Sequence, residues 1–142
     1  MKALCILITI LLPAILFAQT EEVDSVCDDK VFTQVETLPD LKNGKAAFED
    51  SLTGYLRKRT AIPQKGSITY TFIVTTKSKI FDLKKVEGDV KNEETINEAL
   101  ISFAGQWKPA IQNSHTVCAY VGLIIEFEKS ALKIKVVKPV SE

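Results

Sequence analysis

The chain has little of what metal centres and hydrolytic sites are usually built from. His115 is its only histidine, and its three cysteines stand far apart in the sequence. A metal site needs several such ligands at short spacing, and an activated serine or cysteine needs a histidine beside it. A glycine-rich phosphate loop is missing as well. We therefore predict no cofactor and no metal, and we favour a binding protein over an enzyme.

One enzymatic alternative stays open. Glu126 and Glu128 stand two positions apart on an expected strand, so their side chains share one face. Paired carboxylates can perform acid–base chemistry, although a solvated strand face is the commoner reason for such a pair. A small periplasmic enzyme would need a cleft that gathers Glu126, Glu128 and His115.

An excess of charge of one sign is also missing. The chain has 18 basic and 18 acidic residues, which gives a formal net charge of zero. These residues are spread along the sequence, as is typical of a solvated surface. Because the charge is balanced, we expect no nucleic-acid partner. The length suits one domain with one core.

Long apolar runs are limited to the N-terminus. The run between Lys2 and Gln19 contains Pro13 and is shorter than the roughly 20 residues of a spanning helix. A basic start, an apolar stretch and a small-residue exit are typical of a secretory signal peptide, here residues 1–18. We expect a periplasmic or secreted protein, with no retained membrane anchor. An N-terminal helix that is not cleaved is the alternative.

The remaining chain divides into a leader and a domain. Residues 19–30 are acidic and polar, and we interpret them as a loose leader that precedes a domain over residues 31–138. Cys5 lies in the predicted signal peptide, which leaves Cys27 and Cys118. An even number of cysteines in an oxidising compartment favours a disulfide, worth about 4–5 kcal/mol for a loop of this length. Two buried free thiols are the alternative.

Apolar periodicity predicts two helices. The first is expected over residues 45–60, where basic residues in the last turn suit the negative end of the helix dipole. The second is expected after Asn92, whose side chain suits the N-cap position. Each helix has one apolar stripe. The stripes consist of Phe48, Leu52, Tyr55 and Leu56 in the first helix, and of Ile96, Leu100 and Phe103 in the second.

Alternating apolar residues predict the strands. They are expected over residues 67–76, 79–86, 116–128 and 132–136, with a brief one over residues 31–36. The fold class is therefore α+β, with two helices packed on one face of a three- to four-stranded, mainly antiparallel sheet. The predicted core consists of Phe48, Leu52, Leu56, Phe72, Val74, Ile96, Leu100, Phe103, Ile125 and Phe127.

Trp107 is the only tryptophan, and Pro109 follows it closely. We expect Trp107 to pack where the second helix leads into the last strands, with Pro109 fixing the turn. An exposed aromatic that binds a partner is the alternative.

An ordered set of short motifs runs through the domain. The set consists of Val31-Phe32-x-x-Val35-Glu36-x-Leu38-Pro39, Gly44, Val86-x-Gly88, Trp107-Lys108-Pro109-Ala110 and Gln112-Asn113. Across residues 31–128 it resembles the C-terminal domain of TonB proteins, of the free-standing, short type. That domain grips an outer-membrane transporter by adding a strand to the edge of its sheet. The resemblance therefore implies a protein or peptide partner bound by strand addition, and such a transporter is the class of partner that it implies.

Two further functions stay open beside this one. A TonB energy transducer has a retained membrane helix and a long spacer rich in proline and lysine, neither of which we find in this sequence. A membrane-anchored, energy-transducing TonB protein with an uncleaved N-terminal helix is nevertheless one alternative. The other is a structural or interaction module of the cell envelope that is unrelated to transport.

The resemblance also implies which edge binds. In the family the closing strand offers its free edge to the partner, and here that strand covers residues 116–128. The tail at residues 132–137 could fold back through Lys129-Ser130 and cover the same edge. The residues expected to contact the partner share one face of the strand and are Tyr120, Gly122, Ile124 and Glu126. The residues expected to face the helices are Val121, Leu123, Ile125 and Phe127.

Overall fold

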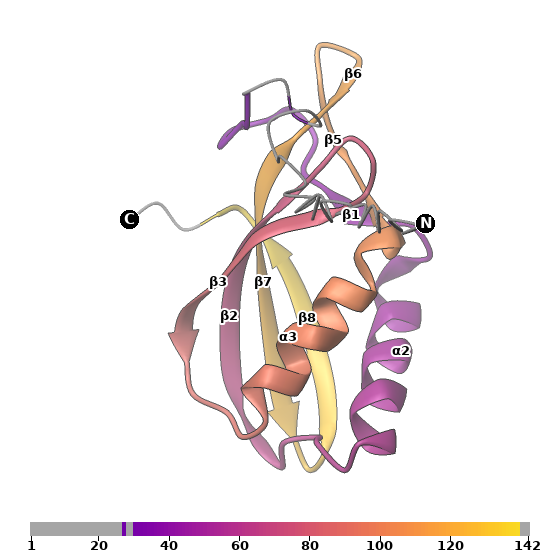
Figure 1. Ribbon diagram of the computed structural model, residues 1–142, viewed down its shortest axis with the longest axis vertical. Coiled ribbons are helices and arrows are strands. Elements are labelled where there is room, and N and C mark those ends of the chain that lie inside the picture. Colours follow the sequence, from indigo (N-terminus) through magenta and orange to yellow (C-terminus); the bar gives the residue numbers. More distant parts are fainter. Residues whose placement is uncertain (1–26, 28–29, 140–142) are drawn as a thin grey trace, which may run out of the picture.

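A four-stranded antiparallel sheet forms the centre of the protein, in the order β3-β2-β7-β8 (Figure 1). The computed structural model describes Cys27 and residues 30–139. The predicted signal peptide and most of the predicted leader lie outside the described residues. The strands are β2 (Lys65–Val74), β3 (Ile80–Gly88), β7 (Ala119–Glu128) and β8 (Ala131–Val137).

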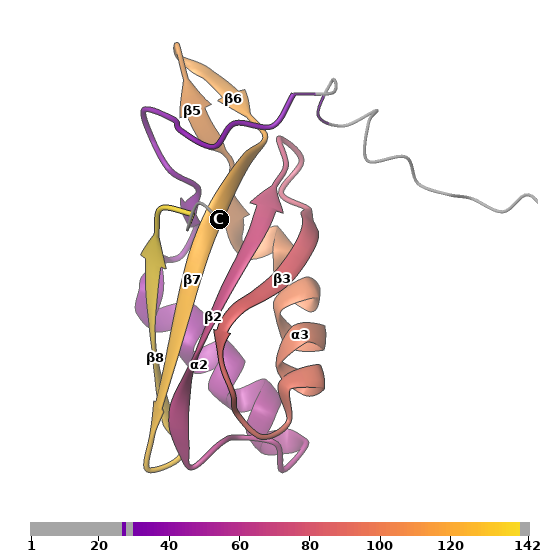
Figure 2. The same cartoon turned by 90° about the vertical axis from the view of Figure 1, so that its left-hand side faces the viewer.

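Within residues 30–139, two helices cover one face of this sheet, and no helix of that range lies over the other face (Figure 2). They are α2 (Gly44–Lys58) and α3 (Glu93–Ser102), and a 3₁₀ turn, η1 (Ala104–Gln106), follows α3. The apolar stripes predicted from the sequence are the faces that the helices bury against the strands. The predicted α+β class is thus confirmed, with two helices on one face of an antiparallel sheet.

Two small pairs of strands complete the fold. β1 (Asp40–Leu41) pairs with β4 (Trp107–Lys108) and joins the start of α2 to the segment after α3. β5 (Ala110–Gln112) and β6 (His115–Val117) form a hairpin that projects from one end of the molecule (Figure 1).

The main core lies between the helices and the sheet. Trp107 has no exposed surface and contacts the rings of Phe48 and Phe72 edge-on, with centroids 6.0 and 5.3 Å apart. The predicted packing of Trp107 inside the protein is therefore confirmed. Nine of the ten predicted core residues are buried, and the tenth, Phe103, is partly buried at the rim against Phe48 and Tyr55.

Two local predictions were wrong in detail. Residues 31–36 form no strand, and only single bridges at Phe32 and Thr37 join this part of the chain to β7 and β5. The strand predicted over residues 116–128 is interrupted at Cys118, because the chain leaves the hairpin there and enters the sheet. Asn92 is the N-cap residue of α3, as predicted, but its side-chain amide donates to the Ala61 carbonyl, 3.1 Å away, and makes no capping hydrogen bond.

A second, smaller apolar cluster lies on the face of the sheet opposite to α2 and α3. Cys27 and Cys118 are bonded there as a disulfide, with Cα atoms 5.7 Å apart, which confirms the predicted pairing. The side chain of Ile73 completes the buried part of this cluster. Partly buried residues that pack against it are Val31, Phe81 and Tyr120.

Candidate functional site: the edges of the sheet

The acid–base residues considered from the sequence do not meet. His115 is exposed in β6, at the projecting hairpin, whereas Glu126 and Glu128 are exposed near the opposite end of β7. A Glu126 carboxylate oxygen is 3.0 Å from the Lys135 amine on the neighbouring strand. Among the described residues, no three metal-ligating side chains gather into a site that could hold an ion. The search for a site therefore turns to the main chain of the sheet.

The two faces of β7 divide as the alternation predicts. The set expected to face the helices, Val121, Leu123, Ile125 and Phe127, is buried in the main core. On the other face, Tyr120 and Ile124 are partly buried and Glu126 is exposed. Gly122 is buried because Val137 lies against it: a Cβ built at Gly122 would stand 2.7 Å from the Val137 Cγ2. Because glycine has no side chain, Val137 at the end of β8 can pack against this position of β7.

Both edges of β7 are occupied by other parts of the chain. Along one edge it pairs with β2 over its whole length. Along the other, β8 pairs with residues 122–128, after a two-residue turn at Lys129-Ser130 in which both φ angles are positive. The tail therefore covers the edge that the sequence analysis expected a partner to use.

The remaining stretch of this β7 edge is covered from the other end of the chain. Residues 30–37, called the strap below, cross the top of the sheet (Figure 2). The Phe32 amide donates to the Cys118 carbonyl and the Tyr120 amide donates to the Phe32 carbonyl, each at 2.9 Å. This bridge is parallel, whereas β8 pairs with the same edge in the antiparallel sense. One edge of β7 thus accepts extended segments in both directions.

One amide on the outer edge of β8 is taken up by a side chain from α2. Glu49 is only 7% exposed, and its Oε1 accepts a hydrogen bond of 2.9 Å from the Ile134 amide. The Lys133 amine lies 3.2 Å from its other carboxylate oxygen. A carboxylate that takes up an outward-pointing amide removes one of the groups that an added strand would use.

The outer edge of β3 is irregular. The pairing of β2 with β3 shifts register twice, between Thr69 and Tyr70 and between Thr71 and Ile73. On the β3 side the second shift includes Asp82, whose φ is +53°. Bulges of this kind bend and twist an edge strand, which makes it a poor template for regular pairing.

Two tyrosines on β2 and β7 have perturbed ionisation. Burial raises the pKa of the Tyr70 phenol, and the nearby charge of Glu93 raises it further. Burial also raises the pKa of Tyr120, whose hydroxyl donates to Asp82, 3.3 Å away. A hydrogen bond from Lys85 to Glu93 raises the pKa of the lysine. Each of these shifts moves the pKa further from neutral pH than the ordinary value of the group.

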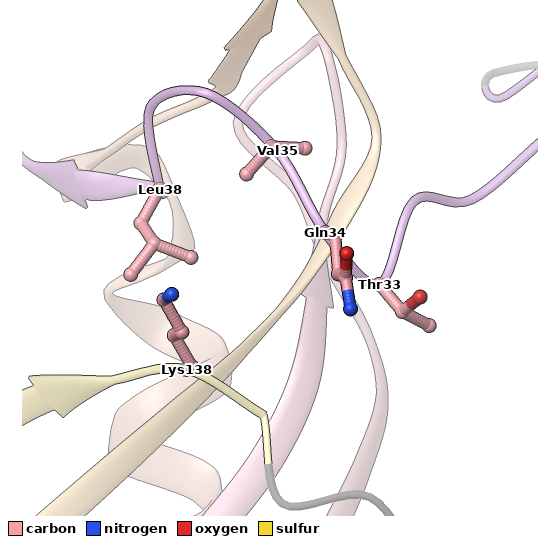
Figure 3. A pocket seen from close by; sticks show the side chains of 5 residues that line it. All are labelled: Thr33, Gln34, Val35, Leu38 and Lys138. Carbon is pink, nitrogen blue, oxygen red and sulfur yellow. The ribbon is translucent and has the colours of Figure 1, made fainter.

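A cavity of about 250 Å³ lies between the strap and the end of β8. Its lining comes from the two ends of the domain, and Figure 3 shows the Lys138 side chain pointing toward the strap across this space. The lining residues are Thr33, Gln34, Val35, Leu38 and Lys138.

Sequence reasoning missed two residues that shape these edges. The sequence could have indicated a buried Glu49, because this residue stands three positions before Leu52 and seven before Leu56, within the apolar stripe of α2. A charge at a buried stripe position calls for a partner. Phe32 was assigned to a short strand, but its pairing with Cys118 and Tyr120 joins distant parts of the chain and leaves no local pattern.

Comparison with known proteins adds no relative. The chain matches no protein-family model, and no curated protein or solved structure is significantly similar to it.

Among the residues that the structure describes, no helix has the length and apolar character needed to cross a membrane.

Proposed function

We propose that this protein is an exported domain, similar to the C-terminal domain of TonB, that binds an extended segment of another protein by main-chain pairing at the edge of β7 that β8 and the strap cover. The observation that carries the proposal is the occupancy of this edge by both an antiparallel strand and a parallel segment of its own chain. Such an edge can pair with an added strand once either covering segment moves. An outer-membrane transporter is the class of partner that the resemblance implies.

The irregular β3 edge and the Glu49-capped β8 edge favour the same location. Strand addition depends on a row of unpaired amides and carbonyls in regular register. The register shifts in β3 and the hydrogen bond from Ile134 to Glu49 interrupt that row on the two outermost strands. The β7 edge becomes regular as soon as a covering segment leaves, because β7 itself pairs without a shift along β8.

Position-specific crosslinking in a cell-envelope extract tests this proposal. A photoreactive residue at Ile124, on the face of β7 without helices, should crosslink to a specific envelope protein. The same residue at Ile101, which is 56% exposed on α3, should not. Equal crosslinking from both positions, or none from either position in both the oxidised and the reduced protein, would contradict binding at β7.

Opening the edges one at a time identifies the one in use. Deleting residues 130–142 bares the β7 edge, so we expect increased crosslinking at Ile124 or self-association of the protein. Because Leu132 and Ile134 belong to the core, circular dichroism must show that the shortened chain still folds. Glu49→Ala opens only the outer edge of β8, whereas Glu49→Gln keeps an acceptor for the Ile134 amide. Increased crosslinking with the alanine variant alone would place binding on β8 instead.

A further inference from the structure

The strap covers a stretch of β7 that β8 does not reach. The last residue of β8, Val137, pairs with Gly122. Beyond that point the edge offers the Cys118 carbonyl and the Tyr120 amide, and both are hydrogen-bonded to Phe32. The strap therefore already makes the contacts that an added strand would make, but it makes them over a single residue.

The strap is attached at two ends by different means. At its far end, Thr37 exchanges two backbone hydrogen bonds with Ile111 of β5, at 3.0 and 3.1 Å. The Glu36 amide also donates to the Gln112 side chain, 3.0 Å away. At its near end, the disulfide from Cys27 holds the chain against Cys118, next to the Phe32 bridge. Only the near end can be released without breaking the hairpin contacts.

The middle of the strap is loosely packed. Thr33 and Gln34 are exposed, and the cavity of about 250 Å³ separates this part of the strap from Lys138 at the end of the tail (Figure 3). At the near end, Val31 packs on the apolar cluster that contains Ile73 and the disulfide. Exchange of the strap would therefore vacate one apolar contact and one pair of hydrogen bonds.

We propose that the strap is an internal substitute for the partner, and that the Cys27–Cys118 disulfide controls whether the partner can replace it. This inference rests on the proposed function and specifies its location at Cys118–Tyr120. The partner is an extended segment that runs parallel to β7, with an apolar residue at the position of Val31. A dithiol reductant opens the device: it transfers two electrons and two protons to the cysteines and itself becomes a disulfide.

The expected size of the effect follows from tethering. A segment held by a short tether competes at an effective concentration of the order of millimolar. The disulfide adds a second tether. Together with the Thr37 hydrogen bonds it fixes both ends of a loop of about ten residues, and this strongly restricts movement of the strap away from β7. Breaking it should strengthen binding of a competing segment at least tenfold, while the remaining tether keeps the affinity moderate.

Hydrogen exchange of two backbone amides measures the opening itself. In Cys27→Ser we expect at least tenfold faster exchange of the Tyr120 amide, which bonds the strap. The Ile134 amide, which bonds Glu49, is the internal reference and should not change. Wild-type protein treated with a dithiol should behave as the variant does. A Tyr120 amide that stays protected in both cases would overturn the proposal.

Binding of the strap sequence as a separate peptide measures how accessible the site is once the strap has left it. The probe is a labelled synthetic peptide of residues 30–39, added to oxidised wild-type protein and to Cys27→Ser. We expect at least tenfold tighter binding to the variant by fluorescence anisotropy, and a peptide with Val31→Asp and Phe32→Pro should bind neither protein. Cys118→Ser is the second variant, should Cys27→Ser prove unstable. Equal binding to oxidised and variant protein would overturn the proposal.

The envelope crosslink separates this proposal from the broader one. If oxidised wild-type protein and Cys27→Ser crosslink equally to one envelope protein through Ile124, the proposed function stands and control by the disulfide is disproved. If no form of the protein crosslinks, the proposed function fails, even where the strap opens on reduction.

Discussion

The two apolar clusters on opposite faces of the sheet are held together in different ways. The helix-covered core has many fully buried side chains, with the Trp107 indole packed against Phe48 and Phe72. Among the described residues, the cluster on the other face buries only Ile73 and the two bonded cysteines. The first is stabilised by apolar burial, whereas the second depends on a covalent bond. A region held in this way can open while the core stays intact.

The largest effect should come from the core. Trp107→Ala removes a fully buried ring that contacts two other aromatic rings, and should cost about 3–5 kcal/mol of unfolding free energy. Urea denaturation followed by circular dichroism measures this loss. Ile101→Ala, at an exposed position of α3, is the control and should change stability by less than about 0.5 kcal/mol. A loss below about 1 kcal/mol for Trp107→Ala would show that apolar burial does not stabilise the main core more than the disulfide stabilises the second cluster.

Breaking the disulfide should cost less. In the unfolded chain the bond closes a loop with a sequence separation of 91 residues, but the strap also regains freedom in the folded variant. We therefore expect Cys27→Ser to lose about 2 kcal/mol, at the low end for natural disulfides. Denaturation of reduced wild-type protein should give the same value. A loss as large as that of Trp107→Ala would show that the strap and the core unfold as one unit.

The smallest effect concerns a polar atom within the core. The Tyr70 hydroxyl is buried, and within the described part of the chain it has no hydrogen-bond partner. Tyr70→Phe should therefore be neutral or stabilise by about 1 kcal/mol, since an unsatisfied buried group is removed. If Tyr70→Phe instead destabilises the protein by more than about 1 kcal/mol, the Tyr70 hydroxyl must form a hydrogen bond in solution.

The raised tyrosine pKa values add a pH dependence. The folded state favours the neutral phenols of Tyr70 and Tyr120, so their contribution is complete below pH 10, the ordinary pKa. This contribution to the stability of the folded state is lost as the pH rises through the raised pKa values of the two phenols in the folded protein. Alkaline denaturation monitored at the phenolate absorption band should show a weaker fall in stability for Tyr70→Phe than for wild type.

Local patterns predicted most of the fold, because helices and strands have their own periodicity. The stripe through Phe48, Leu52 and Leu56 and the alternation along β7 both reappear as buried faces. The strap could not be predicted in this way. Phe32 pairs with residues near Cys118, so its position depends on a contact between distant parts of the chain.

The candidate site was also predicted only in part, because local patterns indicate strands but not contacts between distant residues. Alternating residues in the tail suggested a strand that returns over the β7 edge, and β8 forms that strand. The role of Glu49 was missed, because its partner is a main-chain amide on β8 and amides are the same at every position. Such a contact becomes visible only when the packing of α2 against the sheet is known.

The position of the two cysteines also sets an order of events in the making of the protein. Cys27 leaves the ribosome 91 residues before Cys118, roughly 5 to 20 seconds earlier at usual rates of synthesis. The disulfide cannot form in that interval, and β7 and β8 follow Cys118 in the chain. Each newly made molecule therefore begins with its strap untied, and the bond that ties it can form only after Cys118 has been made.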